Sequence, residues 1–173
     1  KPEKVGILGA GMMGGGIAWS NAQRGIPCVL KDVSDEKAAA GKGYSEKLLA
    51  ARVKQGRTSE REAEGVLSLI TPTANNDTLN GCDLIIEAVF ERRDLKAQVT
   101  KESEPKLAAN GIFASNTSTL PITGLAQASS KPENFIGLHF FSPVDKMPLV
   151  EIIKGARTSP ETLARAYDYV LAI

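Results

Sequence analysis

The amino-acid sequence predicts an α/β fold in which helices flank a doubly wound, mostly parallel sheet. Apolar runs of strand length alternate with helical patterns along nearly all of the 173 residues, and this alternation is typical of parallel sheets. A glycine-rich turn, GAGMMG, joins the first apolar run directly to the first helical pattern. A charged, Ala-rich stretch without strand signals interrupts the alternation at residues 34–69. We therefore expect one domain with a helical-hairpin insertion after its second strand.

The elements before residue 70 follow from local signals. KVGILGAG is predicted to be a strand, MMGGGIAWSNAQRG a helix that ends at Gly25, and IPCVLKD a strand that ends at Asp32. The charged stretch predicts two helices joined at residues 56–58. A capping box formed by Ser59 and Glu62 would begin the second of them.

The elements after residue 70 continue the alternation. Strands are predicted at 70–73 and 83–89, and a charged helix at 93–109, with Pro105 as a kink or an early stop. IFASN is expected to be a strand, PITGLAQA a short helix, and FIGLHFF and LVEII two further strands. The sequence Ser159-Pro160-Glu161 supplies a cap, a first-turn proline and an early acid, which predict the start of a last helix.

Composition excludes several classes of protein. The formal net charge is +1, so no basic surface for nucleic acid is expected. No apolar run reaches the roughly 18 residues of a membrane-spanning helix. Two cysteines, Cys28 and Cys82, and a single histidine are too few for a typical metal site. We expect two reduced, partly buried thiols and no metal.

The glycine-rich turn fits the G-x-G-x-x-G pattern of a Rossmann-type dinucleotide site. Gly9 makes the tight turn, Gly11 lets the backbone approach a pyrophosphate, and Gly14 lets the helix pack on the strand. The N-terminus of that helix presents free N–H groups and a positive dipole end to the phosphates. About 20 residues further on, Asp32 ends the next strand, where a carboxylate accepts hydrogen bonds from the adenosine ribose.

The same carboxylate favours NAD over NADP, because it would repel a 2′-phosphate. Lys31 is a neighbouring cation that could accommodate that phosphate. Adjacent residues of a strand point to opposite faces, so Lys31 and Asp32 cannot both address the ribose. The predicted cofactor is NAD.

The only histidine of the chain belongs to a second constellation. His139 lies in the apolar run FIGLHFF, and Glu151 is the one acid of the apolar run LVEII. If these runs pair as antiparallel strands, their midpoint is Asp145 and His139 faces Glu151. A facing carboxylate would orient the imidazole as a general base. The pattern alone leaves this interpretation and that of a satisfied core histidine equally open.

Five polar residues in a row, Ser115 to Thr119, follow the predicted strand IFA. They stand at the carboxyl end of that strand, where open α/β sheets bind ligands. Helix capping by Ser118 or Thr119 is the alternative interpretation, although a cap accounts for one of the five. The residues alone favour neither ligand binding nor helix capping.

Four segments taken together resemble the 3-hydroxyacyl-CoA dehydrogenases. They are GAGMMGGGIA, LIIEAVFE, FASNTSTLPI and GLHFFSPVDKMPLVEII, and they span nearly the whole chain. The resemblance is greatest to the dehydrogenase part of the fatty-acid oxidation complex alpha subunit, a multifunctional enoyl-CoA hydratase and 3-hydroxyacyl-CoA dehydrogenase. It implies oxidation of L-3-hydroxyacyl-CoA to 3-oxoacyl-CoA in fatty-acid β-oxidation, with hydride transfer to NAD.

The resemblance implies a role for each matching residue. His139 matches the catalytic base, Glu151 its carboxylate partner, and Ser118 the serine that hydrogen-bonds the substrate oxygen. Ser142 stands where many members carry asparagine. The implied cofactor contacts are Gly9, Gly11, Met13, Gly14, Asp32, Val89, Phe90, Glu91, Lys96, Ser118 and Ser142.

The resemblance also implies a larger parent protein. Residues 1–173 would be the NAD-binding domain, truncated at its C-terminal end, with a hydratase domain before it and a helical domain with a catalytic asparagine after it. The substrate would be an acyl-CoA, and the parent would be oligomeric and could pair with a thiolase subunit. We expect the parent protein to lie in the bacterial cytoplasm, and the mitochondrial matrix is the alternative location. The alternatives are an isolated dinucleotide-binding module without turnover, or a 3-hydroxybutyryl-CoA dehydrogenase of an anabolic route.

Overall fold

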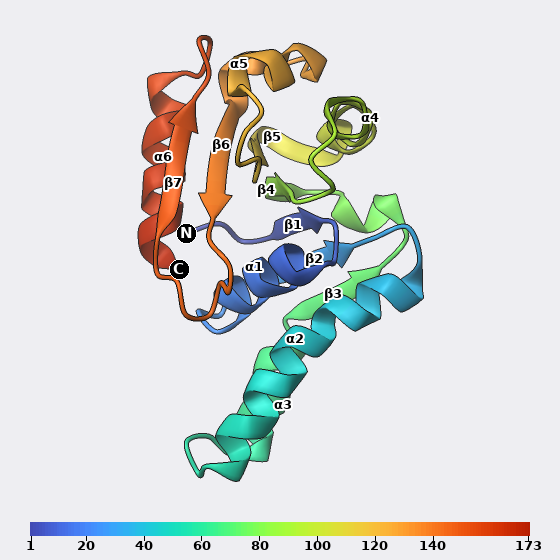
Figure 1. Cartoon of the computed structure of the whole chain (residues 1–173), viewed down its shortest axis with the longest axis vertical. Coiled ribbons are helices and arrows are strands. Elements are labelled where there is room, and N and C mark those ends of the chain that lie inside the picture. The colour runs from blue at the N-terminus through green and yellow to red at the C-terminus, as the bar shows by residue number, and fades with distance from the viewer.

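A seven-stranded sheet runs through the computed structural model, which describes residues 1–173 (Figure 1). The strand order is β3-β2-β1-β4-β5-β6-β7, and only β7 runs antiparallel to its neighbour. The order of the first six strands is that of a Rossmann sheet, so the predicted fold class is confirmed. The strands are β1 (Val5–Leu8), β2 (Cys28–Lys31), β3 (Ile70–Thr73), β4 (Cys82–Glu87), β5 (Leu107–Ser115), β6 (Phe135–Phe140) and β7 (Val150–Lys154).

Helices cover both faces of the sheet because the strands are apolar on both sides. Apolar side chains of α1 and α6 pack on one face, and those of α4 and α5 pack on the other. None of the helices has the length and apolar character needed to cross a membrane. The helices are α1 (Met12–Ala22), α2 (Asp35–Lys54), α3 (Glu60–Leu67), α4 (Arg93–Ser103), α5 (Ile122–Leu125) and α6 (Pro160–Ala172), with 3-10 turns η1 (Asn76–Leu79), η2 (Glu104–Lys106), η3 (Ala126–Ala128) and η4 (Pro132–Asn134).

The predicted helical hairpin is present between β2 and β3. Helices α2 and α3 form an arm that extends away from the sheet (Figure 1). The capping box is formed in both directions: the Glu62 N–H donates to Ser59 Oγ at 3.1 Å, and the Ser59 N–H donates to Glu62 Oε2 at 2.9 Å. Trp19 of α1 packs with Leu49 and Ala63 of the arm in a small core of their own.

The predicted charged helix was too long, and the strand after it too short. Helix α4 ends at Ser103, and a 3-10 turn leads into β5, which begins at Leu107. Pro105 explains the early end, because it lacks a backbone N–H and its ring clashes with the preceding turn. The start of β5 was hidden by an irregularity: its register with β4 shifts between the Cys82 pair and the Leu84 pair.

The predicted strand at 83–89 also ends earlier than expected, at Glu87. The Ala88 N–H still donates to the Leu8 carbonyl oxygen of β1, but the backbone groups of Val89 are taken by side chains. Glu87 Oε2 accepts from the Val89 N–H at 3.0 Å, and the Val89 carbonyl accepts from Lys96 Nζ at 3.2 Å. The two cysteines are free and buried, as expected for structural thiols.

Candidate active site

The glycine loop connects β1 to α1 and requires glycine at two positions. Gly9 has a φ of +93°, and a Cβ there would lie 2.7 Å from the Ala88 carbonyl oxygen. A Cβ on Gly14 would lie 1.6 Å from the Gly9 carbonyl oxygen. Both glycines therefore let α1 start directly against the end of β1.

The same loop leaves room for a ligand. No atom lies within 4 Å of the position that a Cβ would take at Gly11. Helix α1 has no side-chain cap and no acidic residue in its first turn, so its terminal N–H groups and positive dipole end are available. These features fit the pyrophosphate of NAD.

Asp32 lies beside this loop, at the end of β2. Its Oδ2 accepts from the Ala10 N–H at 2.8 Å, and its Oδ1 accepts from the Val33 N–H at 2.7 Å. The carboxylate is half-buried, so the loop and the strand end are tied together while part of the side chain faces solvent. Its contact with the adenosine ribose stays a prediction.

His139 and Glu151 face each other across the β6–β7 ladder, as the symmetry about Asp145 predicted. His139 Nδ1 lies 2.9 Å from Glu151 Oε1, and the side chains are 19% and 54% exposed. Because a carboxylate oxygen accepts, Nδ1 is the donor, and Nε2 keeps the lone pair that a general base needs. The Phe141 ring packs beside the imidazole, with centroids 4.5 Å apart. The pair lies at the rim of the core and is partly exposed, and its role in catalysis stays a prediction.

A pocket of about 290 Å³ opens at the carboxyl ends of β4, β5 and β6. It brings together seven of the predicted site residues from five segments of the chain. Phe90 projects into solvent next to it, and the glycine loop, Asp32 and Glu151 lie outside its wall. The lining residues are Met13, Ala88, Val89, Glu91, Lys96, Asn116, Ser118, His139, Phe140, Phe141 and Ser142.

Beneath this pocket lies a buried polar network that the sequence did not reveal. Its centre is Glu87, whose side chain is 1% exposed. Glu87 Oε1 accepts from the Ser115 hydroxyl at 2.6 Å, and Oε2 accepts from Lys96 Nζ at 2.5 Å. The network therefore fixes the ends of β4 and β5 and the start of α4 relative to one another. The available signal was a single acid that ends the apolar run LII of β4.

Lys96, which the resemblance placed among the cofactor contacts, is itself buried in this network. Its ammonium group reaches Glu87, the Val89 carbonyl oxygen and, at 3.5 Å, Glu91 Oε1. A lysine has three N–H donors, and two of them are used in the hydrogen bonds to Glu87 and to the Val89 carbonyl oxygen. A direct bond from Lys96 to the cofactor stays a prediction.

Glu91 links the network to the polar run after β5. Its carboxylate accepts from the Ser118 N–H at 2.8 Å, the Ser118 hydroxyl at 3.0 Å and the Thr117 hydroxyl at 2.7 Å. Burial alone would raise the pKa of Glu91, but these hydrogen bonds and the nearby Lys96 ammonium lower the pKa to about 2. The pocket wall thus carries a carboxylate that stays charged at neutral pH.

Two further residues were missed as individuals. Asn116 Oδ1 accepts from the Phe140 N–H at 2.8 Å, which ties the polar run to β6 next to His139. Met12 Sδ lies 3.3 Å from the Ser142 hydroxyl, so the start of α1 touches the segment after β6. Asn116 stood within the predicted polar run, but the sequence gave no sign that it would bond the backbone of another strand.

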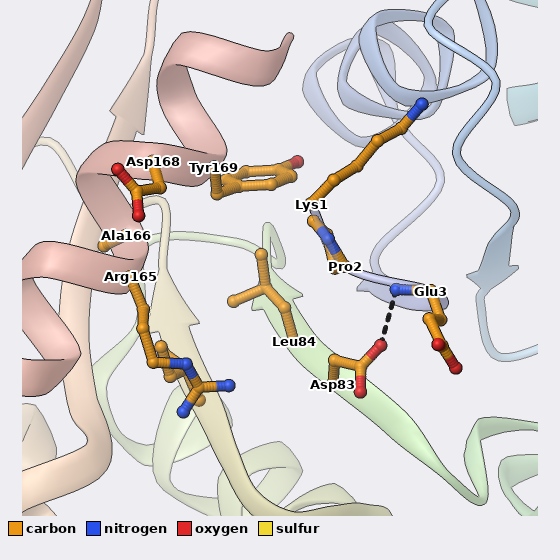
Figure 2. A pocket seen from close by; sticks show the side chains of 10 residues that line it. Lys1, Pro2, Glu3, Asp83, Leu84, Arg165, Ala166, Asp168 and Tyr169 are labelled. Atoms are coloured by element: carbon orange, nitrogen blue, oxygen red, sulfur yellow. Dashed lines mark hydrogen bonds between the residues drawn. The ribbon is translucent and has the colours of Figure 1, made fainter.

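A second hollow, of about 430 Å³, lies near the amino ends of β1 and β4, between the N-terminal residues and α6 (Figure 2). Its lining carries charges of both signs, those of Lys1, Arg165, Asp83 and Asp168. Lys1 Nζ donates to the Arg24 carbonyl oxygen and points away from the two carboxylates (Figure 2). One carboxylate is already in use, since Asp83 Oδ2 accepts from the Glu3 N–H at 2.7 Å. This hollow contains none of the predicted site residues.

Several of the known proteins that this chain is similar to are dehydrogenases. Residues 4–173 match the family described as 3-hydroxyacyl-CoA dehydrogenase, NAD binding domain. The structure of (S)-3-hydroxybutyryl-CoA dehydrogenase from Ralstonia eutropha is 37% identical, with a TM-score of 0.94 over 99% of this chain. That of 3-hydroxybutyryl-CoA dehydrogenase from Escherichia coli K12 is 30% identical, with a TM-score of 0.94 over 99% of this chain. The dehydrogenase part of multifunctional enzyme 1 from C. elegans is 29% identical, with a TM-score of 0.86, again over 99%.

These proteins are longer than the chain. The chain spans 61% of the Ralstonia protein, 36% of the E. coli protein and 39% of the C. elegans one. The matched part holds the glycine loop and the His–Glu pair.

Proposed function

This chain belongs to the 3-hydroxyacyl-CoA dehydrogenase family as an NAD-binding domain, and on that premise we propose that it carries the catalytic base of an L-3-hydroxyacyl-CoA dehydrogenase. The parent enzyme would oxidise L-3-hydroxyacyl-CoA to 3-oxoacyl-CoA and reduce NAD. The observation that carries the proposal is the His139–Glu151 pair, with Nδ1 and Oε1 2.9 Å apart. His139 lines the same pocket as Ser118, next to the end of α1 that fits the cofactor phosphates.

In the proposed reaction, NAD supplies a hydride acceptor when bound. His139 Nε2 takes the proton of the 3-hydroxyl as the C3 hydrogen leaves as hydride, so that the C3–O bond becomes a carbonyl. Glu151 holds the ring through Nδ1 and stabilises the imidazolium that forms. The proton is thus kept on the protein while the electron pair moves to the cofactor.

Ser118 is proposed to hydrogen-bond the substrate oxygen. In this structure its hydroxyl donates to Glu91 Oε2, which also accepts the Ser118 N–H. The hydroxyl can therefore turn toward a substrate without leaving that carboxylate oxygen unpaired. Glu91 would remain in place through Thr117 and Lys96.

The proposed cofactor site extends along the same edge of the sheet. Gly9, Gly11 and Gly14 would hold the pyrophosphate against α1, and Asp32 would bind the adenosine ribose. The remaining contacts would come from residues around the pocket: Met13, Val89, Phe90, Glu91, Lys96, Ser118 and Ser142.

We place the parent enzyme in fatty-acid β-oxidation, as a cytoplasmic, oligomeric, multifunctional protein that could pair with a thiolase subunit. Support comes from the likeness to the dehydrogenase part of a multifunctional enzyme. Residues beyond this domain would complete the substrate cleft, so the isolated 173-residue chain is expected to bind NAD with little or no turnover. Measurable dehydrogenase activity of the isolated chain would contradict that last expectation.

A second candidate is a short-chain 3-hydroxybutyryl-CoA dehydrogenase of an anabolic route. Two relatives carry that substrate in their names. Assays of the full-length protein with acyl-CoA substrates of four to sixteen carbons, and with NADH against NADPH, separate the candidates. Preference for the four-carbon substrate together with NADPH would favour this second one.

The decisive test is reduction of acetoacetyl-CoA by NADH in the full-length protein, with and without the change His139→Gln. General base catalysis contributes about 10²- to 10⁴-fold, so we expect kcat to fall by that factor while NADH still binds. A variant that kept the wild-type rate would remove His139 from the role of base.

A further inference from the structure

The loop between β6 and β7, residues 141–149, joins the two strands that carry His139 and Glu151. In Figure 1 it runs down beside α1. Asp145 lies at the centre of this loop. Tyr44, from the middle of α2, donates its hydroxyl to Asp145 Oδ1, and the Asp145 N–H donates to the Tyr44 oxygen at 3.3 Å. One side chain of the arm is thus bonded twice to one residue of the loop.

Packing beneath this contact leaves the loop little freedom. Val144 is buried, and a Cβ on Gly16 of α1 would lie 2.7 Å from the Val144 Cβ and 3.4 Å from the Tyr44 ring. Because Gly16 has no side chain, Val144 and the Tyr44 ring can both pack against this turn of α1. The Ser142–Met12 contact fixes the same loop at a second point, at the start of α1.

Helix α2 is itself held close to the glycine loop. A Cβ on Gly41 would lie 2.6 Å from both the Cβ and the carbonyl oxygen of Ala10, and a Cβ on Gly15 would lie 2.7 Å from the Gly41 carbonyl oxygen. Tyr44 is one turn beyond Gly41 on the same helix. The Tyr44–Asp145 contact therefore joins the loop to the place where α1, α2 and the glycine loop meet.

From this arrangement we infer that Tyr44 and Asp145 are positioning residues for the proposed hydride transfer. They hold the loop, with Ser142 in the pocket wall, in a fixed place relative to the glycine loop, and so set the distance between the bound dinucleotide and His139. Neither residue touches the pocket. The inference rests on the proposed function, because it assumes that NAD and the hydroxyacyl group meet in that pocket.

The Tyr44–Asp145 hydrogen bond does not depend on pH near neutrality. Burial, followed by the hydrogen bond to Asp145, raises the pKa of Tyr44 above its ordinary value. Its hydroxyl therefore remains a donor over the working range of pH. A misplacement of about 1 Å far from the reacting atoms can cost roughly 100-fold in rate, so loosening a loop that is held at several points should cost less.

The test compares Tyr44→Phe with wild type in the full-length protein. This change keeps the ring in the space above Gly16 and removes only the hydroxyl. We expect kcat for reduction of acetoacetyl-CoA to fall about 10-fold, within the bound set by such misplacement, and the Kd for NADH to rise several-fold by calorimetry. Asp145→Asn, which keeps an acceptor oxygen, should stay close to wild type. Tyr167→Phe, at an exposed tyrosine of α6, is the matched control.

A purely structural contact gives a different result. Tyr44→Phe would then lower the melting temperature and leave both kcat and the Kd for NADH at wild-type values, and this outcome overturns the inference. Absence of any acetoacetyl-CoA reduction by the wild type would instead defeat the proposed function. In that case the Kd for NADH still decides whether Tyr44 and Asp145 position the cofactor end of the loop.

Discussion

Two hydrogen-bonded pairs of side chains, Glu87 with Lys96 and His139 with Glu151, lie at the ends of β4 and β6, on either side of β5. They differ mainly in burial. Glu87 and Lys96 are 1% and 3% exposed, and they hydrogen-bond to each other, to the Ser115 hydroxyl and to backbone groups of Val89. His139 and Glu151 are 19% and 54% exposed, and the imidazole faces a pocket. A buried pair cannot exchange protons with solvent without a large penalty, whereas a half-exposed pair can. Burial thus separates a pair that holds the site from a pair suited to proton transfer.

The largest predicted effect comes from breaking the buried pair. Lys96→Met leaves the Glu87 carboxylate buried without its cation, and removal of one partner of such a pair costs about 3–5 kcal/mol of unfolding free energy. Urea unfolding of the 173-residue chain measures this loss. The double change Glu87→Gln with Lys96→Met removes both charges and should recover much of the stability. An unchanged urea midpoint for Lys96→Met would show that the pair does not stabilise the fold.

The second prediction concerns the exposed pair. Glu151→Gln should lower kcat of the full-length protein roughly 100-fold, because the imidazole loses the partner that fixes its tautomer and stabilises its charged form. The unfolding free energy should change by less than about 0.5 kcal/mol, as for most exposed substitutions. Glu161→Gln, at an exposed acid of α6, is the control. If Glu151→Gln lost stability and kept its rate, the contrast between the two pairs would be reversed.

The smallest predicted effect belongs to Glu91, which lies between these extremes of burial. Its folded pKa of about 2 is below its ordinary value of 4.5, so its ionised form stabilises the fold. That contribution is fully present above the ordinary pKa and is lost as pH falls through the folded pKa. Solvent screening of this partly exposed group keeps the effect small.

Thermal unfolding of wild type and Glu91→Gln at several pH values tests this sign. The difference in melting temperature between them should be constant near neutral pH and should shrink between about pH 5 and pH 2. A difference that grew as the pH fell would mean that the Glu91 pKa is raised in the folded protein.

The parts of the site that local patterns specify could be predicted from the sequence. The glycine loop depends on spacing within one turn, and the facing of His139 and Glu151 depends on a register centred on Asp145. The capping box at Ser59 is likewise confined to one turn. In each case, a short segment contains all the information.

The parts that depend on contacts between distant segments could not be predicted. Glu87 meets Ser115 and Lys96 only after β4, β5 and α4 are packed together, and Tyr44 meets Asp145 across 101 residues of chain. The end of α4 was misjudged for a related reason. Pro105 marked the stop, but no local signal showed that β5 begins directly after it, where Leu107 pairs with Cys82 of β4.

The antiparallel strand β7 places a condition on where this part of the chain can change in length. Side chains alternate between the faces of a strand, so shifting the β6–β7 pairing by one residue would send Glu151 to the opposite face from His139. Residues 141–149 are unpaired, so the loop can absorb an added residue without changing that register. A residue added within β6 or β7 requires a bulge or separates the two side chains. The pairing therefore limits the position of an insertion in this hairpin more than its length.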